Sequence, residues 1–215
     1  MATPDLKSAT TMQLLIALER RDVSSSELLD AMLANIERTN PAVNAVVSMD
    51  MERARAEATA ADNSREAGDP CGPLHGLPMT IKDCFETLNL ATTAGAPELA
   101  GHMASRDADV VRLLRRAGAV VWAKTNVPYY AGDHQTYNDV HGRTNNPWRL
   151  THTAGGSSGG AAAAVACGFT TAEVGSDIGG SIRQPAAVNG VFGLKTTHGL
   201  VSGRGHIPSP PGSLT

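Results

Sequence analysis

Glycine is distributed very unevenly along this chain. The first 67 of its 215 residues contain none, whereas residues 155–199 hold 11 of the 22 glycines. Glycine weakens helix interiors but tolerates turns and close backbone approaches that other residues resist. The chain should therefore begin with helices and then pass into a region built from turns and tight packing.

The glycine-free part carries three helical patterns. Residues 11–21 place apolar side chains at helical spacing, and residues 50–67 are rich in Ala, Glu and Arg, which predicts a solvated helix. Ser24 and Glu27 form an S-x-x-E capping box that opens another helix, and Asn40-Pro41 should end it. A short strand is expected at 45–48.

Beyond residue 70, strand and helix patterns alternate. We expect strands at 78–81, 119–123, 172–175 and 191–194, and helices at 107–117 and 161–166. Such alternation is typical of an α/β fold. The sequence predicts an N-terminal helical segment over residues 1–70 that packs on an α/β core over residues 71–215.

Composition excludes several classes of function. The 18 Lys and Arg residues nearly balance 21 Asp and Glu, a formal net charge of −3, so a basic nucleic-acid surface is not expected. Aromatic residues make up 4% of the chain, too few for base-stacking platforms. No apolar run approaches the roughly 18 residues that a membrane span needs, and charges interrupt the N-terminus where a secretory signal would be apolar.

Cysteine usage points to a reducing compartment. The three cysteines, Cys71, Cys84 and Cys167, are widely spaced and form no C-x-x-C pair. Neither a disulfide framework nor a zinc site is therefore expected, and the cytosol fits best.

Two glycine-framed serine segments are the first candidates for chemistry. Ser157 and Ser158 lie between two glycine pairs, directly before the helix expected at 161–166, whose N-terminal N–H groups favour negative charge. In the second segment, successive N–H groups of Ile178, Gly179, Gly180 and Ser181 can form a nest around an oxyanion, flanked by Asp177 and Arg183. Taken separately, the first could be a linker or helix cap, and the second a tight turn with a surface ion pair.

Lys82 is the third candidate. It follows the apolar strand expected at 78–81, and burial would lower its pKa and make it a base. We expect the neighbouring Asp83 to turn away or to be paired elsewhere, because its charge would oppose that change. The alternative is a strand-end lysine that reaches water.

Together these segments resemble the signature of the amidase signature family of Ser-cisSer-Lys amidohydrolases. The similarity is carried by GGSSGGAAAAVACGFTTAEVGSDIGGSIRQPAAVNGVFGLKTTHG, and upstream by PMTIKD and AKTNVP. It extends over residues 10–210. The resemblance implies a mixed central β-sheet flanked by helices, and no metal or organic cofactor.

The resemblance also implies a role for each site residue. Ser181 would be the nucleophile, Ser157 a bridging serine after a cis peptide bond from Gly156, and Lys82 the general base. The N–H groups of residues 178–181 would form the oxyanion hole, with Ser158, Asp177 and Arg183 supporting the site. Members of this family usually run to about twice this length, so the fold is expected to be truncated and one sheet edge to be left unpaired.

Three further interpretations stay open. Gly155–Gly159 satisfies G-x-S-x-G, the nucleophile elbow of α/β-hydrolases, with His198 or His206 as its base. The chain could instead be a non-catalytic remnant, or a subunit of an amidotransferase that passes ammonia to a second reaction. The loop with His134 and His141 has no common metal spacing but could line the substrate entrance.

The sequence therefore predicts a cytoplasmic amidohydrolase that cleaves carboxylic amides through an acyl-enzyme. Its partner would be a small-molecule amide, with neither nucleic acid nor membrane involved and a homodimer possible. Which amide it cleaves depends on pocket residues that the sequence does not identify.

Overall fold

The structure, a computed structural model, describes residues 9–209. Residues 1–8 of the predicted N-terminal segment, and residues 210–215, lie outside this range. The longer helices are α1 (Thr11–Arg20), α2 (Ser25–Val43), α3 (Met51–Ala67), α4 (Asp109–Arg116), α5 (Gly159–Cys167) and α6 (Arg183–Asn189). Single 3-10 turns lie at Pro97–Leu99 and Tyr129–Ala131.

A small mixed sheet forms the centre of the molecule. Its strands are β1 (Val46–Met49), β2 (Pro78–Lys82) and β3 (Val120–Thr125), in the order β1-β3-β2. β1 is antiparallel to β3 and β2 is parallel to it, with Lys82 opposite Thr125 at their carboxyl ends. A separate hairpin joins β4 (Tyr137–Asn138) and β5 (Gly142–Arg143). The predicted α/β class with a mixed sheet is confirmed.

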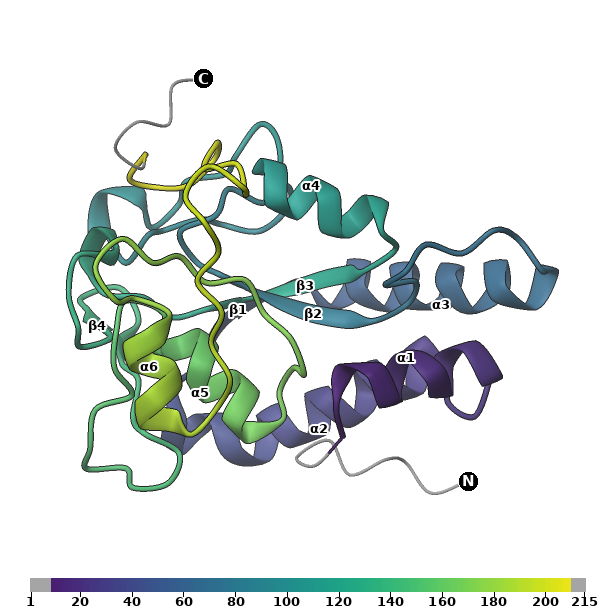
Figure 1. Cartoon of the computed structure of the whole chain (residues 1–215), viewed down its shortest axis with the longest axis horizontal. Helices are drawn as coiled ribbons and strands as arrows, with labels where there is room; N and C mark the ends of the chain where they lie inside the picture. The colour runs from purple at the N-terminus through teal and green to yellow at the C-terminus, as the bar shows by residue number, and fades with distance from the viewer. Residues whose placement is uncertain (1–8, 210–215) are drawn as a thin grey trace.

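Helices cover this sheet on both sides. In Figure 1, α4 lies above the strands, whereas α1, α2 and α5 lie below them. β2 and β3 are buried along their whole length, which explains their near-continuous apolar sequences. One apolar cluster joins residues of α1 and α2, such as Leu14 and Leu28, to residues of the strands, such as Ile81 and Trp122. The division at residue 70 remains a prediction.

The predicted stop at Asn40-Pro41 is wrong, because α2 continues through Pro41 to Val43. Proline in the last turn costs only one hydrogen bond, and the helix ends at Asn44 in a left-handed conformation. The Asn40 side chain then accepts from the N–H groups of Ala45 and Val46, which turns the chain into β1. The capping box of Ser24 and Glu27 is present as expected.

The two strands expected at 172–175 and 191–194 are also absent. Both segments lack ladder partners among residues 9–209 and are assigned to no strand. Phe192 and Leu194 are 108% and 80% exposed, and both face a hollow of about 780 Å³. A β-type sequence becomes a strand only where a neighbour supplies hydrogen bonds, and none is in place here.

Helix α6 was not expected from the sequence. Its seven residues include Pro185, which is tolerated because it lies in the first turn. Among residues 9–209, no helix combines the length and the hydropathy needed to span a bilayer.

Candidate active site

Lys82 is the last residue of β2, and its side chain is fully buried. Its Nζ lies 2.8 Å from Oγ of Ser157 and 2.9 Å from Oγ of Ser176. Burial lowers the pKa of Lys82, against the opposing charges of Cys84, Glu173 and Asp177. The lysine therefore has the environment that a neutral amine requires.

Asp83 points away from this lysine, as the sequence analysis expected. Its carboxylate accepts from the backbone N–H and the hydroxyl of Thr93, and lies 3.8 Å from Nζ of Lys124. Lys124 on β3 is a second fully buried lysine, and burial lowers its pKa to about 8. Because Asp83 has its own partners, its charge does not hold the proton on Lys82.

The Ser157 loop depends on glycine for space. The Gly156–Ser157 peptide bond is cis, in agreement with the expectation from the family resemblance. A Cβ at Gly156 would lie 2.5 Å from the Asp133 carbonyl oxygen, and one at Gly160 would lie 2.4 Å from the backbone of Asn126. The glycines let this loop and the start of α5 sit directly against neighbouring backbone.

Asp177 organises the second serine loop. Its carboxylate accepts from the N–H groups of Gly180, Ile182 and Arg183. It also accepts from the guanidinium of Arg183, and this pairing holds the pKa of Asp177 well below its usual range. The predicted contact between Asp177 and Arg183 is therefore present.

The Ser181 loop is fastened beside the Ser157 loop. The Ser158 N–H donates to the Ser181 carbonyl at 3.1 Å, and the Ser158 hydroxyl bonds the backbone of Ser176. Within the described residues, the Ser181 hydroxyl makes no hydrogen bond, and neither do the N–H groups of Ile178, Gly179 and Ser181. The two serine loops are thus adjacent, but no hydrogen bond joins the Ser157 and Ser181 side chains in this part of the chain.

Sequence reasoning did not assign a role in the site to Ser176 or Glu173. Ser176 comes five residues before Ser181, and its hydroxyl contacts Lys82. Glu173 is half-buried and accepts from the hydroxyls of Thr80 and Thr125; burial raises its pKa to about 7. The available signal was that Glu173 lies inside the strand expected at 172–175, where a charged residue is unusual and indicates a special role.

The nucleophile-elbow alternative requires a histidine beside Ser157. The structure places Lys82 there, and no histidine is hydrogen-bonded to the Ser157 hydroxyl within residues 9–209. His206 instead lies against Ser176 and Cys84, and His198 lines the hollow. The contacts of Ser157 do not match an elbow serine.

Comparison with known proteins identifies the family. The family model described as Amidase matches residues 27–214. The chain belongs to the amidase family. Among curated relatives of this amidase-family chain, it is 47% identical to a glutamyl-tRNA(Gln) amidotransferase subunit from Roseiflexus sp. (strain RS-1), over 89% of this chain and 39% of the relative. The protein of that name from Synechococcus sp. (strain CC9605) is 45% identical over 86% of this chain and 38% of the relative.

Solved structures of amidases share the fold. The native peptide amidase of Stenotrophomonas maltophilia superposes with a TM-score of 0.87 at 39% identity, over 94% of this chain and 42% of that one. A fatty acid amide hydrolase superposes with a TM-score of 0.89 at 29% identity, over 96% of this chain and 37% of that one. This amidase-family chain thus spans about two-fifths of the length of the curated relatives it matches.

Proposed function

We propose that this chain carries the catalytic residues of an amidohydrolase that cleaves carboxylic amides to an acid and ammonia or an amine. Neutral Lys82 accepts the proton of the Ser157 hydroxyl, and Ser157 accepts the proton of Ser181. The Ser181 oxygen attacks the amide carbonyl carbon. The relay then runs in reverse and protonates the leaving nitrogen, the C–N bond breaks, and water hydrolyses the acyl-enzyme.

One observation carries this proposal: the 2.8 Å contact between Nζ of Lys82 and Oγ of Ser157, both in the protein interior. A lysine at the surface would keep its proton at neutral pH, and a lone buried serine would have no base. Burial of the two groups together supplies a base and its proton donor at hydrogen-bond distance.

The oxyanion of the tetrahedral intermediate would sit against the N–H groups of residues 178–181. Those of Ile178, Gly179 and Ser181 have no partner within the described residues, so they are available to developing charge. The Gly180 N–H donates to Asp177 at 2.8 Å and is already engaged. We therefore assign the larger contribution to the other three, with Ser158, Asp177, Arg183 and Gly156 holding the loops in place.

The setting of this activity follows from the same features. We propose a small amide as substrate and the cytosol as compartment, since the sequence has three widely spaced cysteines and no C-x-x-C pair. Metal and organic cofactors have no role in the proposed relay. Homodimer formation remains a prediction.

A second candidate function follows from the names of the relatives. The curated relatives described above are amidotransferase subunits, so the same relay could release ammonia for use by a partner subunit. Co-purification with a second subunit, and amide cleavage that rises when this subunit is added, would favour this role.

A serine-reactive fluorophosphonate tests the relay without requiring a complete substrate pocket. We expect it to label Ser181, as mapped by peptide mass spectrometry. Lys82→Met should slow labelling by about 10²-fold or more, the usual contribution of a general base. Lys124→Met is the matched control, because it removes a buried lysine from the neighbouring strand that, among the described residues, is hydrogen-bonded to Phe85 and Thr92 and to neither serine.

Labelling of Ser157, or a Lys82→Met rate within about tenfold of wild type, would contradict the proposal, because a tenfold change corresponds to only about 1.4 kcal/mol. Circular dichroism of each variant confirms that it is folded before the rates are compared.

A further inference from the structure

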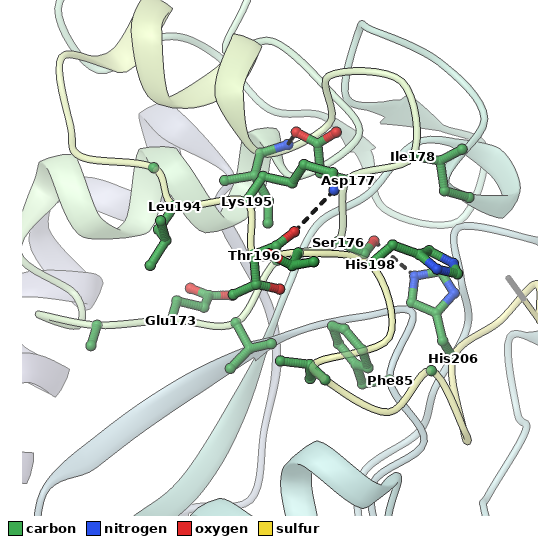
Figure 2. A pocket seen from close by; sticks show the side chains of 18 of the residues that line it. Phe85, Glu173, Ser176, Asp177, Ile178, Leu194, Lys195, Thr196, His198 and His206 are labelled. Carbon is green, nitrogen blue, oxygen red and sulfur yellow. Dashed lines mark hydrogen bonds between the residues drawn. The ribbon is translucent and has the colours of Figure 1, made fainter. Parts of the chain in front are cut away.

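Lys82 has a second set of neighbours besides Ser157. Ser176 Oγ lies 2.9 Å from Nζ of Lys82 and 2.7 Å from Nε2 of His206. The His206 Nε2 also lies 3.1 Å from Sγ of the fully buried Cys84. Figure 2 shows Ser176 directed at the His206 ring, which is 5% exposed and packs edge-on against Phe85. Three titratable groups thus surround one hydroxyl.

The hydrogen bonds of His206 fix its tautomer. Its Nδ1 lies 2.7 Å from the Pro208 carbonyl oxygen, which can only accept, so Nδ1 carries a proton. In neutral His206, Nε2 is then an acceptor, and the Ser176 hydroxyl donates a hydrogen bond to it. The Ser176 oxygen in turn accepts from Lys82, so a continuous donor-to-acceptor chain runs from Lys82 through Ser176 to His206.

Charges around the cluster act in both directions. Burial lowers the pKa of His206, but the charge and hydrogen bond of Cys84 and the hydrogen bond to the Pro208 carbonyl together raise it, so the net pKa is raised although Lys82 opposes this. Burial raises the pKa of Cys84, and His206 and Lys82 together lower it. Glu173 and Asp177 face Lys82 from the neighbouring segment, and His198 lines the same hollow as His206.

We propose that His206 is a positioning residue for amide cleavage: through Ser176 it accepts the proton that Lys82 must lose to become a base, with Cys84 as the group that stabilises the resulting imidazolium. The proton on Lys82 Nζ passes to Ser176 Oγ as the hydroxyl proton of Ser176 passes to His206 Nε2. Lys82 becomes neutral, His206 becomes charged and the total charge is unchanged. This inference rests on the proposed role of Lys82 as a base.

The arrangement predicts opposite effects for the two neighbours of His206. Two cations in one cluster disfavour each other, so removal of the Lys82 amine should raise the titration midpoint of His206. Removal of the Cys84 sulfur takes away the group that favours imidazolium and should lower that midpoint. Because coupling is reciprocal, loss of His206 should make Lys82 harder to deprotonate.

Nitrogen-15 NMR of histidine-labelled chain tests the cluster without any turnover. The His206 signals are assigned by their loss in His206→Gln. We expect neutral His206 to carry its proton on Nδ1, with a midpoint that rises by about 0.5 unit or more in Lys82→Met and falls in Cys84→Ala. A proton on Nε2, or a midpoint unchanged in both variants, overturns the inference; if Lys82→Met does not fold, the fall in Cys84→Ala decides.

The pH profile of Ser181 labelling provides the functional readout. The labelling rate should rise with pH as Lys82 loses its proton, and in His206→Gln this rise should occur at higher pH. In the control His198→Gln it should stay where it is in wild type. An unshifted rise in His206→Gln overturns the inference. If wild-type Ser181 does not react at all, the proposed function fails. The NMR titration still decides whether Lys82 and His206 share a proton through Ser176.

Discussion

Glu173 should make the stability of this chain depend on pH in a direction opposite to that of most carboxylates. Burial raises the pKa of its carboxyl from 4.5 to about 7, against the lowering by hydrogen bonds from Thr125 and Thr80. The folded state therefore holds a proton between pH 4.5 and 7 that the unfolded chain has already released. Stability falls as pH rises through this window and is level above it.

The size of the effect follows from the shift. A change of 7 − 4.5 = 2.5 units at 1.36 kcal/mol per unit gives an upper limit of about 3 kcal/mol. Glu173→Gln keeps the shape of the side chain and removes the titration. The variant should match wild type near pH 4.5 and exceed its free energy of unfolding by up to about 3 kcal/mol at pH 8.

Urea unfolding from pH 4.5 to 8.5, followed by circular dichroism, measures this difference. The exposed Glu66→Gln on α3 is the matched control and should leave the difference from wild type constant across the range. A Glu173→Gln curve parallel to wild type, or one that falls below it as pH rises, would refute the reasoning.

Three further outcomes are expected. Gly160→Ala should destabilise the chain by about 1–3 kcal/mol in thermal unfolding, because its Cβ would lie 2.4 Å from the backbone of Asn126; Gly101→Ala, with open space around its Cβ, should change little, and equal losses would contradict this account. Asp177→Asn should slow Ser181 labelling by about tenfold or more, since the amide loses the charge that anchors the loop; an unchanged rate would show that the loop holds its shape without it. The chain alone should hydrolyse propionamide at least about 10²-fold more slowly than a full-length relative, measured as ammonia release, because the relay tolerates little misplacement; comparable turnover in a soluble monomer would contradict this.

Local patterns were enough to predict most helices and the three sheet strands. Ser24 and Glu27 located the start of α2, and apolar runs located β2 and β3 within one or two residues. The end of α2 was misplaced because proline is a weak stop in a last turn, where only one hydrogen bond depends on it. What a residue does to a helix depends on its place in the helix, which the sequence alone does not give.

Features that depend on distant partners were harder to predict. The segment around Phe192 has a strand-like sequence, yet no strand lies beside it to complete a ladder among the described residues. The approach of Lys82 to Ser157 was expected from the family resemblance, since neither motif on its own specifies a contact across 75 residues. Ser176 lies inside the signature run and His206 was considered only as a base for the nucleophile elbow, so their contacts with Lys82 and Cys84 emerged only from the fold.

Helix α5 limits how this site can change over evolutionary time. Its residues are small, and from Gly159 to Ala164 all are buried. The helix packs against α2, β2, β3 and α6, so a larger side chain at any of these positions would displace the serine loop that precedes it. Changes in substrate preference are therefore expected in segments outside α5, and mutational libraries aimed at altered selectivity should leave the helix intact.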